Sequence, residues 1–175
     1  ITPNPRFLFF SPKHREAFNH VLYGIRERKG FVQLTGEVGA GKTTICRAIL
    51  EALGDRFATA VILNPLLDTD HLIKAIAMEF GLQVKGLDRL ETLSLLNQHL
   101  LRLVEEHRDA VLIIDEAQDL SDELLEQVRL LSNLETEKRK LLHIVLFGQP
   151  ELDERLRRPE IRQLLQRITF HYRLR

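Results

Sequence analysis

The chain has 175 residues, a length that fits one domain with a sizeable core. Apolar residues make up 44% and charged residues 29%, and 25 basic side chains balance 25 acidic ones. This neutral balance is typical of a globular protein and argues against a strongly basic nucleic-acid binder or a binder of anionic membranes. The single cysteine, Cys46, excludes an internal disulfide. No apolar run approaches the roughly 18 residues of a membrane helix. The cysteine usage fits a reducing compartment, and we expect this domain in the cytoplasm.

The N-terminal segment combines an apolar arm with a helix. Residues 1–11 (ITPNPRFLFFS) contain two prolines and are expected to lie extended over the domain. Ser11 is a good N-cap and Pro12 a good first helical residue, so a helix is predicted from there to Lys29-Gly30. Two roles of the arm remain open from the sequence. The arm is expected either to cover an edge of the core or, together with its helix, to contact a ligand of the domain.

The segment from Gly36 to Thr43 is the most informative of the chain. Its sequence, GEVGAGKT, fits the pattern G-x-x-x-x-G-K-[ST] of phosphate-binding loops. An apolar strand over 31–35 precedes it and an amphipathic helix over 44–53 follows it, which is the context that the pattern requires. Glycines let the backbone approach phosphates, and successive N–H groups with the helix N-terminus attract an anion. We therefore predict a nucleoside triphosphate site at this segment, called the phosphate loop below.

Two side chains of the phosphate loop have distinct expected roles. Lys42 should reach the β- and γ-phosphates, and the Thr43 hydroxyl should ligate Mg²⁺. The nucleotide should also contact the backbone along the loop, and the predicted contacts are Gly36, Glu37, Val38, Gly39, Ala40, Gly41, Lys42, Thr43 and Thr44. If the N-terminal arm contacts a ligand, that ligand is expected to be the nucleotide base.

The middle of the chain predicts one strand and two helices. Residues 58–63 form the strand, and a first helix follows over 68–80. Asp88 and Glu91 match a capping box that starts the second helix, which runs to Glu106. Leucines recur along this second helix at helical spacing and are expected in the core rather than in a zipper: Leu90, Leu93, Leu96, Leu100 and Leu103.

Three further strands are predicted at 110–114, 141–147 and 168–174. The first is a continuous apolar run, as expected of a parallel strand buried on both faces, and the second is a buried strand in which His143 is expected in the core. The last alternates as an edge strand does. Helices are predicted over 121–133 and from Pro150 onward. Five strands that alternate with helices predict an α/β fold, a three-layer α/β/α sandwich around a mainly parallel sheet.

A second nucleotide motif follows the strand at 110–114. This apolar run ends in Asp115 and Glu116. Downstream of a phosphate loop, Asp115 is expected to hold Mg²⁺, through water, and Glu116 to polarise the attacking water. No Asn-Lys-x-Asp pattern for guanine is present, so ATP is the expected nucleotide.

Three stretches carry a family resemblance. GEVGAGKTT, LIIDEAQDL and LFGQPEL, in this order and spacing, resemble the AAA+ ATPase domain of the general secretion pathway protein A family. Pilus-biogenesis and transposition ATPases are relatives of that family. The opening TPNPRFLFFSPKHREA is also similar to the family's start, so the resemblance covers nearly the whole chain.

The resemblance implies a strand order and a sensor residue. In such P-loop proteins one strand is inserted between the phosphate-loop strand and the Asp-Glu strand, which gives the order 5-1-4-3-2 here. The inserted strand is 141–147, and Gln149 then occupies the sensor position beside the γ-phosphate. The residues alone are also consistent with Gln149 as a cap of the helix that starts at Pro150.

The resemblance further implies an arginine supplied by a neighbouring subunit. Arg167 matches its place before the last strand, and Arg162 is the second candidate. Residues 155–175 hold seven arginines and one acid, whereas residues 115–137 hold eight acids and one arginine. Such opposite surfaces suit a head-to-tail homo-oligomeric ring. Two other interpretations remain open: solvated helix faces, or a patch for a nucleic-acid backbone.

Taken together, the motifs predict one AAA+ core domain over 1–175, with an N-terminal arm and helix over 1–30 and the helical lid of the family outside these residues. The predicted activity is Mg²⁺-dependent ATP hydrolysis, an ATPase reaction. By resemblance it is coupled to the assembly of an envelope secretion or pilus machine, at the cytoplasmic face of the inner membrane, with membrane contact only through other regions. A DNA-directed ATPase of the transposition or initiator type is the alternative, and a non-hydrolysing nucleotide-binding scaffold is the third.

Overall fold

The computed structural model describes residues 11–28, 30–63, 65, 68–134, 136, 138–161 and 170–174. The expected arm over residues 1–10 and both candidate subunit-bridging arginines, Arg162 and Arg167, lie outside the described residues.

Five parallel strands form the centre of the domain. Their order is β2-β3-β4-β1-β5, which is the predicted order read from the opposite edge. All four strand pairs are parallel, so the sheet is parallel throughout where a mainly parallel one was expected. The strands are β1 (Phe31–Gly36), β2 (Phe57–Ile62), β3 (Asp109–Ile114), β4 (Leu142–Gly148) and β5 (Phe170–Leu174).

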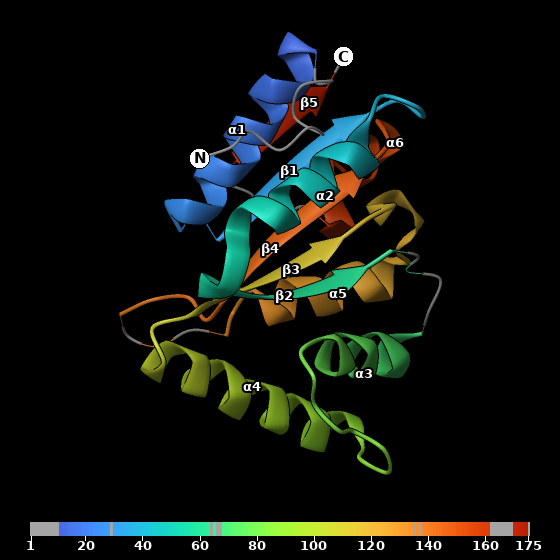
Figure 1. Cartoon of the computed structure of the whole chain (residues 1–175). Coiled ribbons are helices and arrows are strands. Elements are labelled where there is room, and N and C mark those ends of the chain that lie inside the picture. The colour runs from blue at the N-terminus through green and yellow to red at the C-terminus, as the bar shows by residue number, and fades with distance from the viewer. Residues whose placement is uncertain are drawn as a thin grey trace.

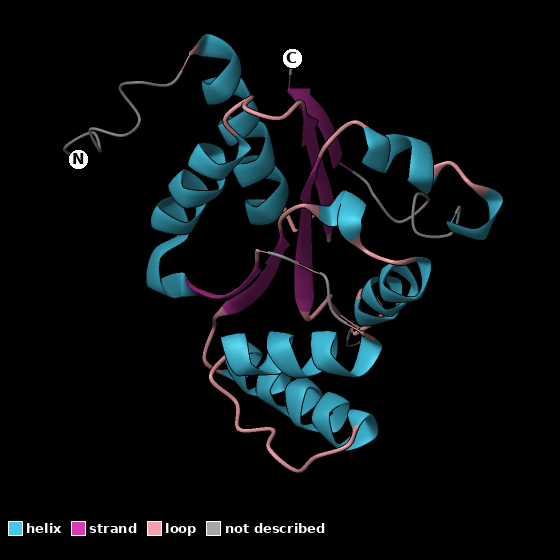
Figure 2. Cartoon of the chain, turned by 90° about the vertical axis from the view of Figure 1, so that its right-hand side faces the viewer, coloured by secondary structure: helices cyan, strands magenta, loops and turns pink. Residues whose placement is uncertain are grey.

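Helices cover both faces of this sheet, as the edge-on view in Figure 2 shows. One face carries α1 (Pro12–Arg26) and α2 (Lys42–Leu53). The other face and the β2 edge carry α3 (Thr69–Glu79), α4 (Arg89–Glu105), α5 (Asp122–Leu131) and α6 (Glu151–Leu156). Short 3-10 turns complete the described elements: η2 (Gly54–Arg56), η3 (Ala117–Asp119) and η4 (Pro159–Ile161). The predicted three-layer α/β/α sandwich is confirmed.

The central strands are mostly apolar because each of their faces meets a helical layer; the buried polar exceptions include Gln33 and Thr35 on β1 and His143 on β4. Along β4, Ile144 and Leu146 pack into one core, and Val145 and Phe147 into the other. This alternation follows from the pleat, which points successive side chains to opposite faces. A largely apolar run is therefore expected for the sequence of such a strand.

The helix starts follow the capping residues that the sequence predicts. The Ser11 side chain accepts a hydrogen bond from the N–H of His14, and Pro12 is the first helical residue. Asp88 and Glu91 form both bonds of the capping box at the start of α4. The leucine stripe of α4 needs one correction, because Leu90 is 77% exposed whereas the rest of the stripe packs in or against the core.

The strand order decides where the site lies. The carboxyl ends of parallel strands meet at one edge of the sheet, and β4 lies between β1 and β3. The phosphate loop after β1, Gln149 after β4 and Asp115-Glu116 after β3 are therefore neighbours in space, as can be followed in Figure 1. Within the described residues no helix is long and apolar enough to cross a membrane.

Candidate nucleotide-binding site

The phosphate loop keeps an open backbone between β1 and α2. Gly39 and Gly41 have φ values of +80° and +96°, in the left-handed region that favours glycine. The N–H of Ala40 donates to the carbonyl of Glu37 at 3.0 Å, which closes the turn, and a Cβ added at Gly39 would meet no atom within 4 Å. This conformation leaves room for an anion beside the loop.

A cavity of about 370 Å³ lies against this loop. It is bounded by segments from three strand ends, and the lining residues are Val38, Gly39, Gly41, Lys42, Thr43, Glu116 and Gln149. Thr43 of the phosphate loop and Glu116 of the Asp-Glu motif, 73 positions apart in the sequence, thus face one cavity.

Lys42 is held within the loop that it belongs to. Its ammonium donates to the carbonyls of Gly36 at 2.6 Å and Glu37 at 2.9 Å, and its side chain is only 7% exposed. An ammonium has three N–H donors, and the described residues accept two of them. The third is available for a phosphate oxygen in the cavity.

Asp115 is a buried carboxylate directly behind the cavity. It is 8% exposed, and its Oδ1 accepts a hydrogen bond from the N–H of Glu116 at 2.8 Å. Burial raises the pKa of Asp115, and the charge of Glu116 adds to the rise, while the Glu116 N–H and the Lys42 charge oppose it. A buried carboxylate without a full counter-charge is a suitable partner for a cation.

Replacing Asp115 by asparagine should stabilise the ligand-free protein. Because the fold raises the pKa of this carboxyl, ionisation at neutral pH costs stability, and the neutral asparagine removes that cost. We expect a higher Tm for the ligand-free variant than for the ligand-free wild type, with loss of the further stabilisation by Mg²⁺-ATP. Thermal melting with and without Mg²⁺-ATP measures both effects. A variant that melts below the wild type and still responds to Mg²⁺-ATP would contradict the assignment.

Glu116 has a backbone conformation that non-glycine residues seldom adopt. Its φ and ψ are 52° and 43°, in the left-handed region. Its Oε2 accepts a hydrogen bond from Nε2 of Gln118 at 2.6 Å, and the side chain lines the cavity. Such local strain is found where a side chain must be aimed.

Gln149 lies at the tip of β4, between the two motifs. It lines the cavity, and its backbone N–H donates to Oε1 of Gln118 at 2.9 Å. The side chain of Gln149 does not cap α6, because Pro150 is the N-cap and no side-chain cap bond is present; only the Gln149 carbonyl accepts from this helix, from the N–H of Leu152 at 2.9 Å.

Residues 25–156 match the protein family described as AAA domain. The match spans the phosphate loop, the Asp-Glu motif and Gln149. The chain belongs to this AAA domain family. The chain is also 48% identical, over 175 residues, to general secretion pathway protein A of Aeromonas hydrophila. That alignment covers 99% of the chain and 32% of the relative, so the chain spans about a third of the length of this relative.

Solved structures show the same AAA fold. The Aeropyrum pernix ORC2 protein, solved as complexes with ADPNP and ADP, matches with a TM-score of 0.67 and 20% identity over 93% of this chain and 46% of that chain. Cdc6p from Pyrobaculum aerophilum gives a TM-score of 0.65 and 21% identity over 95% and 46% of the two chains.

The remaining predicted contacts of the AAA domain differ in exposure. Glu37 and Val38 are exposed at the tip of the phosphate loop, and Gly36 is buried as the last residue of β1. Thr44 is exposed and does not line the cavity. Asp115 does not line it either.

The oxygen donors near the cavity fit a Mg²⁺ ion that is bound jointly by protein, phosphate and water better than a metal ion held by protein side chains alone. Among the described residues there is no group of three or more His, Cys, Asp and Glu side chains that could hold a metal ion. Mg²⁺ is instead bound through one or two protein oxygens together with phosphate oxygens and water. The Thr43 hydroxyl at the cavity and the buried Asp115 carboxylate supply such oxygens.

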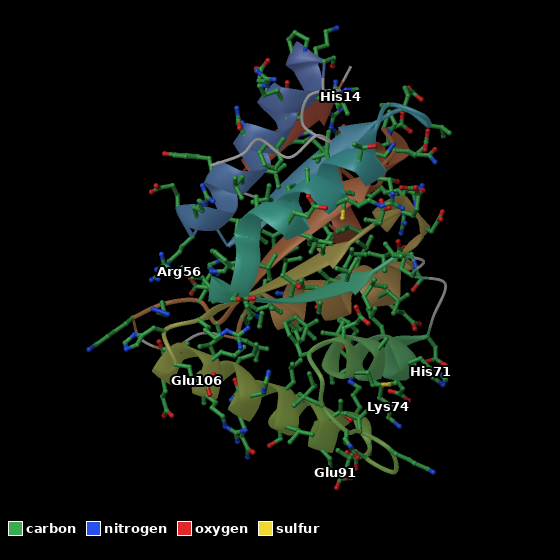
Figure 3. The ribbon with its side chains drawn as sticks, in the orientation of Figure 1. His14, Arg56, His71, Lys74, Glu91 and Glu106 are labelled. Carbon is green, nitrogen blue, oxygen red and sulfur yellow. The ribbon has the colours of Figure 1, made fainter. Side chains whose placement is uncertain are left out.

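His14 contacts and supports the phosphate loop. The sequence did not indicate this contact. Its Nε2 lies within hydrogen-bond distance of the carbonyl of Ala40, and a Cβ added at Gly41 would lie 2.7 Å from the same nitrogen. Figure 3 shows His14 in the first turn of α1, at the end of the sheet where the loop lies. No local pattern links positions 26 residues apart, so only the fold could reveal this contact.

The charged segments 115–137 and 155–175 meet within one molecule. Arg155 donates to Asp122 at 2.8 Å, and also to the carbonyls of Gln118 at 2.7 Å and of Leu120. Arg173 donates to the buried Asp153 at 3.0 Å. Part of the charge that suggested a contact between subunits is therefore used inside the AAA domain.

Proposed function

We propose that this AAA domain binds ATP with Mg²⁺ and hydrolyses it to ADP and phosphate. One observation carries the proposal: Lys42 and Thr43 of the phosphate loop share a single cavity with Glu116 and Gln149 from two other strand ends. Charge-neutralising, metal-binding and water-orienting groups are thereby within reach of one triphosphate, which is the set that phosphoryl transfer requires.

Each of these groups has a defined part in the reaction. The loop N–H groups and Lys42 bind the phosphates and stabilise the charge that develops on them. Thr43 and Asp115 would hold Mg²⁺, which supplies further charge neutralisation when bound. Glu116 orients a water molecule and takes its proton as the water oxygen bonds to the γ-phosphorus, and the bond to the ADP oxygen breaks. Gln149 contacts the same water or the γ-phosphate.

Release of inorganic phosphate is the direct test of this activity. We expect release from ATP in the presence of Mg²⁺, little release from GTP, and none after chelation of the metal with EDTA. Release at the rate of the buffer alone under all conditions would reject hydrolysis and leave a nucleotide-binding scaffold.

We further propose that hydrolysis is coupled to the assembly of an envelope secretion or pilus machine, at the cytoplasmic face of the inner membrane. The 48% identity to general secretion pathway protein A of Aeromonas hydrophila supports this coupling. A hydrolysis-deficient variant in the native host should then lose secretion or piliation. Stimulation of ATP hydrolysis by DNA, falling steeply with salt, would instead support the DNA-directed alternative.

The AAA family supports assembly into a homo-oligomer, in which Arg167 of one subunit would contact the γ-phosphate of its neighbour. Replacing Arg167 by alanine should lower the turnover number at least about 10³-fold under assembly conditions. It should leave the basal rate of dilute monomer unchanged. Rates measured across a protein concentration series separate the two effects. An equal fall at every concentration would contradict a role in trans.

A further inference from the structure

Gln118 connects the two residues proposed to handle the attacking water. Its Nε2 donates to Oε2 of Glu116 at 2.6 Å, and its Oε1 accepts the backbone N–H of Gln149 at 2.9 Å. Both ends of one amide are therefore used, and each end can serve only in this direction, because a carboxylate accepts and a backbone N–H donates. The amide fixes the distance between the end of β3 and the tip of β4.

The backbone of Gln118 is itself fastened. Arg155 of α6 donates to the Gln118 carbonyl at 2.7 Å, and its other nitrogen donates to Asp122 at 2.8 Å. Gly148 leaves room for the amide, since a Cβ there would lie 3.1 Å from Oε1 of Gln118 and 2.8 Å from a methyl group of Leu152. The amide thus lies in a defined place rather than on a free surface.

The bond to Gln118 occupies only one oxygen of Glu116. Oε1 of Glu116 has no hydrogen-bond partner among the described residues, and the side chain lines the cavity. Gln118 does not line the cavity. The arrangement holds the carboxylate by one oxygen and leaves the other for a water molecule beside a γ-phosphate.

We propose that Gln118 is a positioning residue for ATP hydrolysis, which orients Glu116 toward the water and ties it to Gln149. This role rests on the proposed ATPase function. Gln118 lies outside the nucleotide pocket and affects the rate of the chemical step through its amide N–H donor rather than through its size. Misplacing a catalytic group by about 1 Å costs up to about 100-fold in rate, so the loss of this bond should be measurable.

Two variants of Gln118 separate donation from packing. Gln118→Ala removes both bonds and should lower kcat about tenfold or more, with the Kd for Mg²⁺-ATP within about twofold of wild type. Gln118→Glu keeps the size and the acceptor for the Gln149 N–H but replaces the donor by a second carboxylate, which repels Glu116. We expect kcat of Gln118→Glu to fall at least as far as that of Gln118→Ala.

Steady-state phosphate release at saturating ATP supplies kcat, calorimetric ATP titration supplies Kd, and thermal melting checks folding. Gln98→Ala, on α4 and away from the cavity, is the matched control and should behave as wild type. Wild-type kcat in Gln118→Glu would show that Gln118 acts only through packing. A kcat above the wild-type value in either variant would show that Gln118 slows hydrolysis. Either result overturns the proposal. A wild type without turnover would instead reject the ATPase function itself.

Discussion

Replacement of Lys42 by alanine is expected to weaken ATP binding by about 100-fold or more. Two effects add. The phosphates lose a buried ammonium, and a charged hydrogen bond contributes about 1.5–3 kcal/mol, of which each 1.4 kcal/mol is tenfold in Kd. In addition, the carbonyls of Gly36 and Glu37 lose the donor that now joins them at 2.6 and 2.9 Å, so the loop is no longer held open by its own lysine. Calorimetric titration with Mg²⁺-ATP measures the change.

Lys74→Ala is the matched control for this experiment. Lys74 lies on α3, far from the phosphate loop in Figure 3, so the same charge is removed at a distance. The control should bind ATP as the wild type does. An affinity that is unchanged in Lys42→Ala, with the fold intact by thermal melting, would reject the assignment of the loop.

The replacement of Glu116 by glutamine is expected to separate binding from turnover. Glutamine keeps the length of the side chain and an oxygen that can accept from Gln118, so the cavity lined by Lys42 and Thr43 should keep its shape. It cannot take a proton from water, and general-base catalysis contributes about 10²–10⁴-fold. We therefore expect wild-type affinity for Mg²⁺-ATP and a rate of phosphate release lowered by at least about 100-fold.

Glu106→Gln provides the comparison for this charge removal. Glu106 is exposed at the end of α4 (Figure 3) and should tolerate the change without loss of turnover. Turnover in Glu116→Gln at the wild-type rate would remove Glu116 from the mechanism. A parallel loss of ATP binding would show that its role is structural.

Local patterns were sufficient to predict the elements and the two motifs. Strand ends, helix caps and the phosphate loop depend on neighbouring residues, and the structure places them within a few residues of the prediction. The strand order is a different matter. Periodicity does not contain it, and the prediction that β4 lies between β1 and β3 came from the family resemblance.

Contacts between distant segments could not be predicted, because nothing local selects them. His14 with Ala40 and Gln118 with Gln149 join residues 26 and 31 positions apart. Leu90 was predicted wrongly for a geometric reason. At 3.6 residues per turn, the six residues from Leu90 to Leu96 rotate the side chain by about 240°, which leaves Leu90 about 120° from the buried stripe. Counting apolar residues at three-residue steps overlooks this rotation around the helix axis.

The central claim is that the phosphate loop holds a triphosphate whose metal is shared by Thr43 and Asp115. A crystal structure with Mn²⁺ in place of Mg²⁺ and a non-hydrolysable ATP analogue tests it most directly, because anomalous scattering locates the metal. We predict the β- and γ-phosphates between the loop N–H groups and Lys42. The metal should be bound to the Thr43 hydroxyl and joined to Asp115 through water. A nucleotide outside this cavity, or a metal with neither residue in its coordination shells, would contradict the claim.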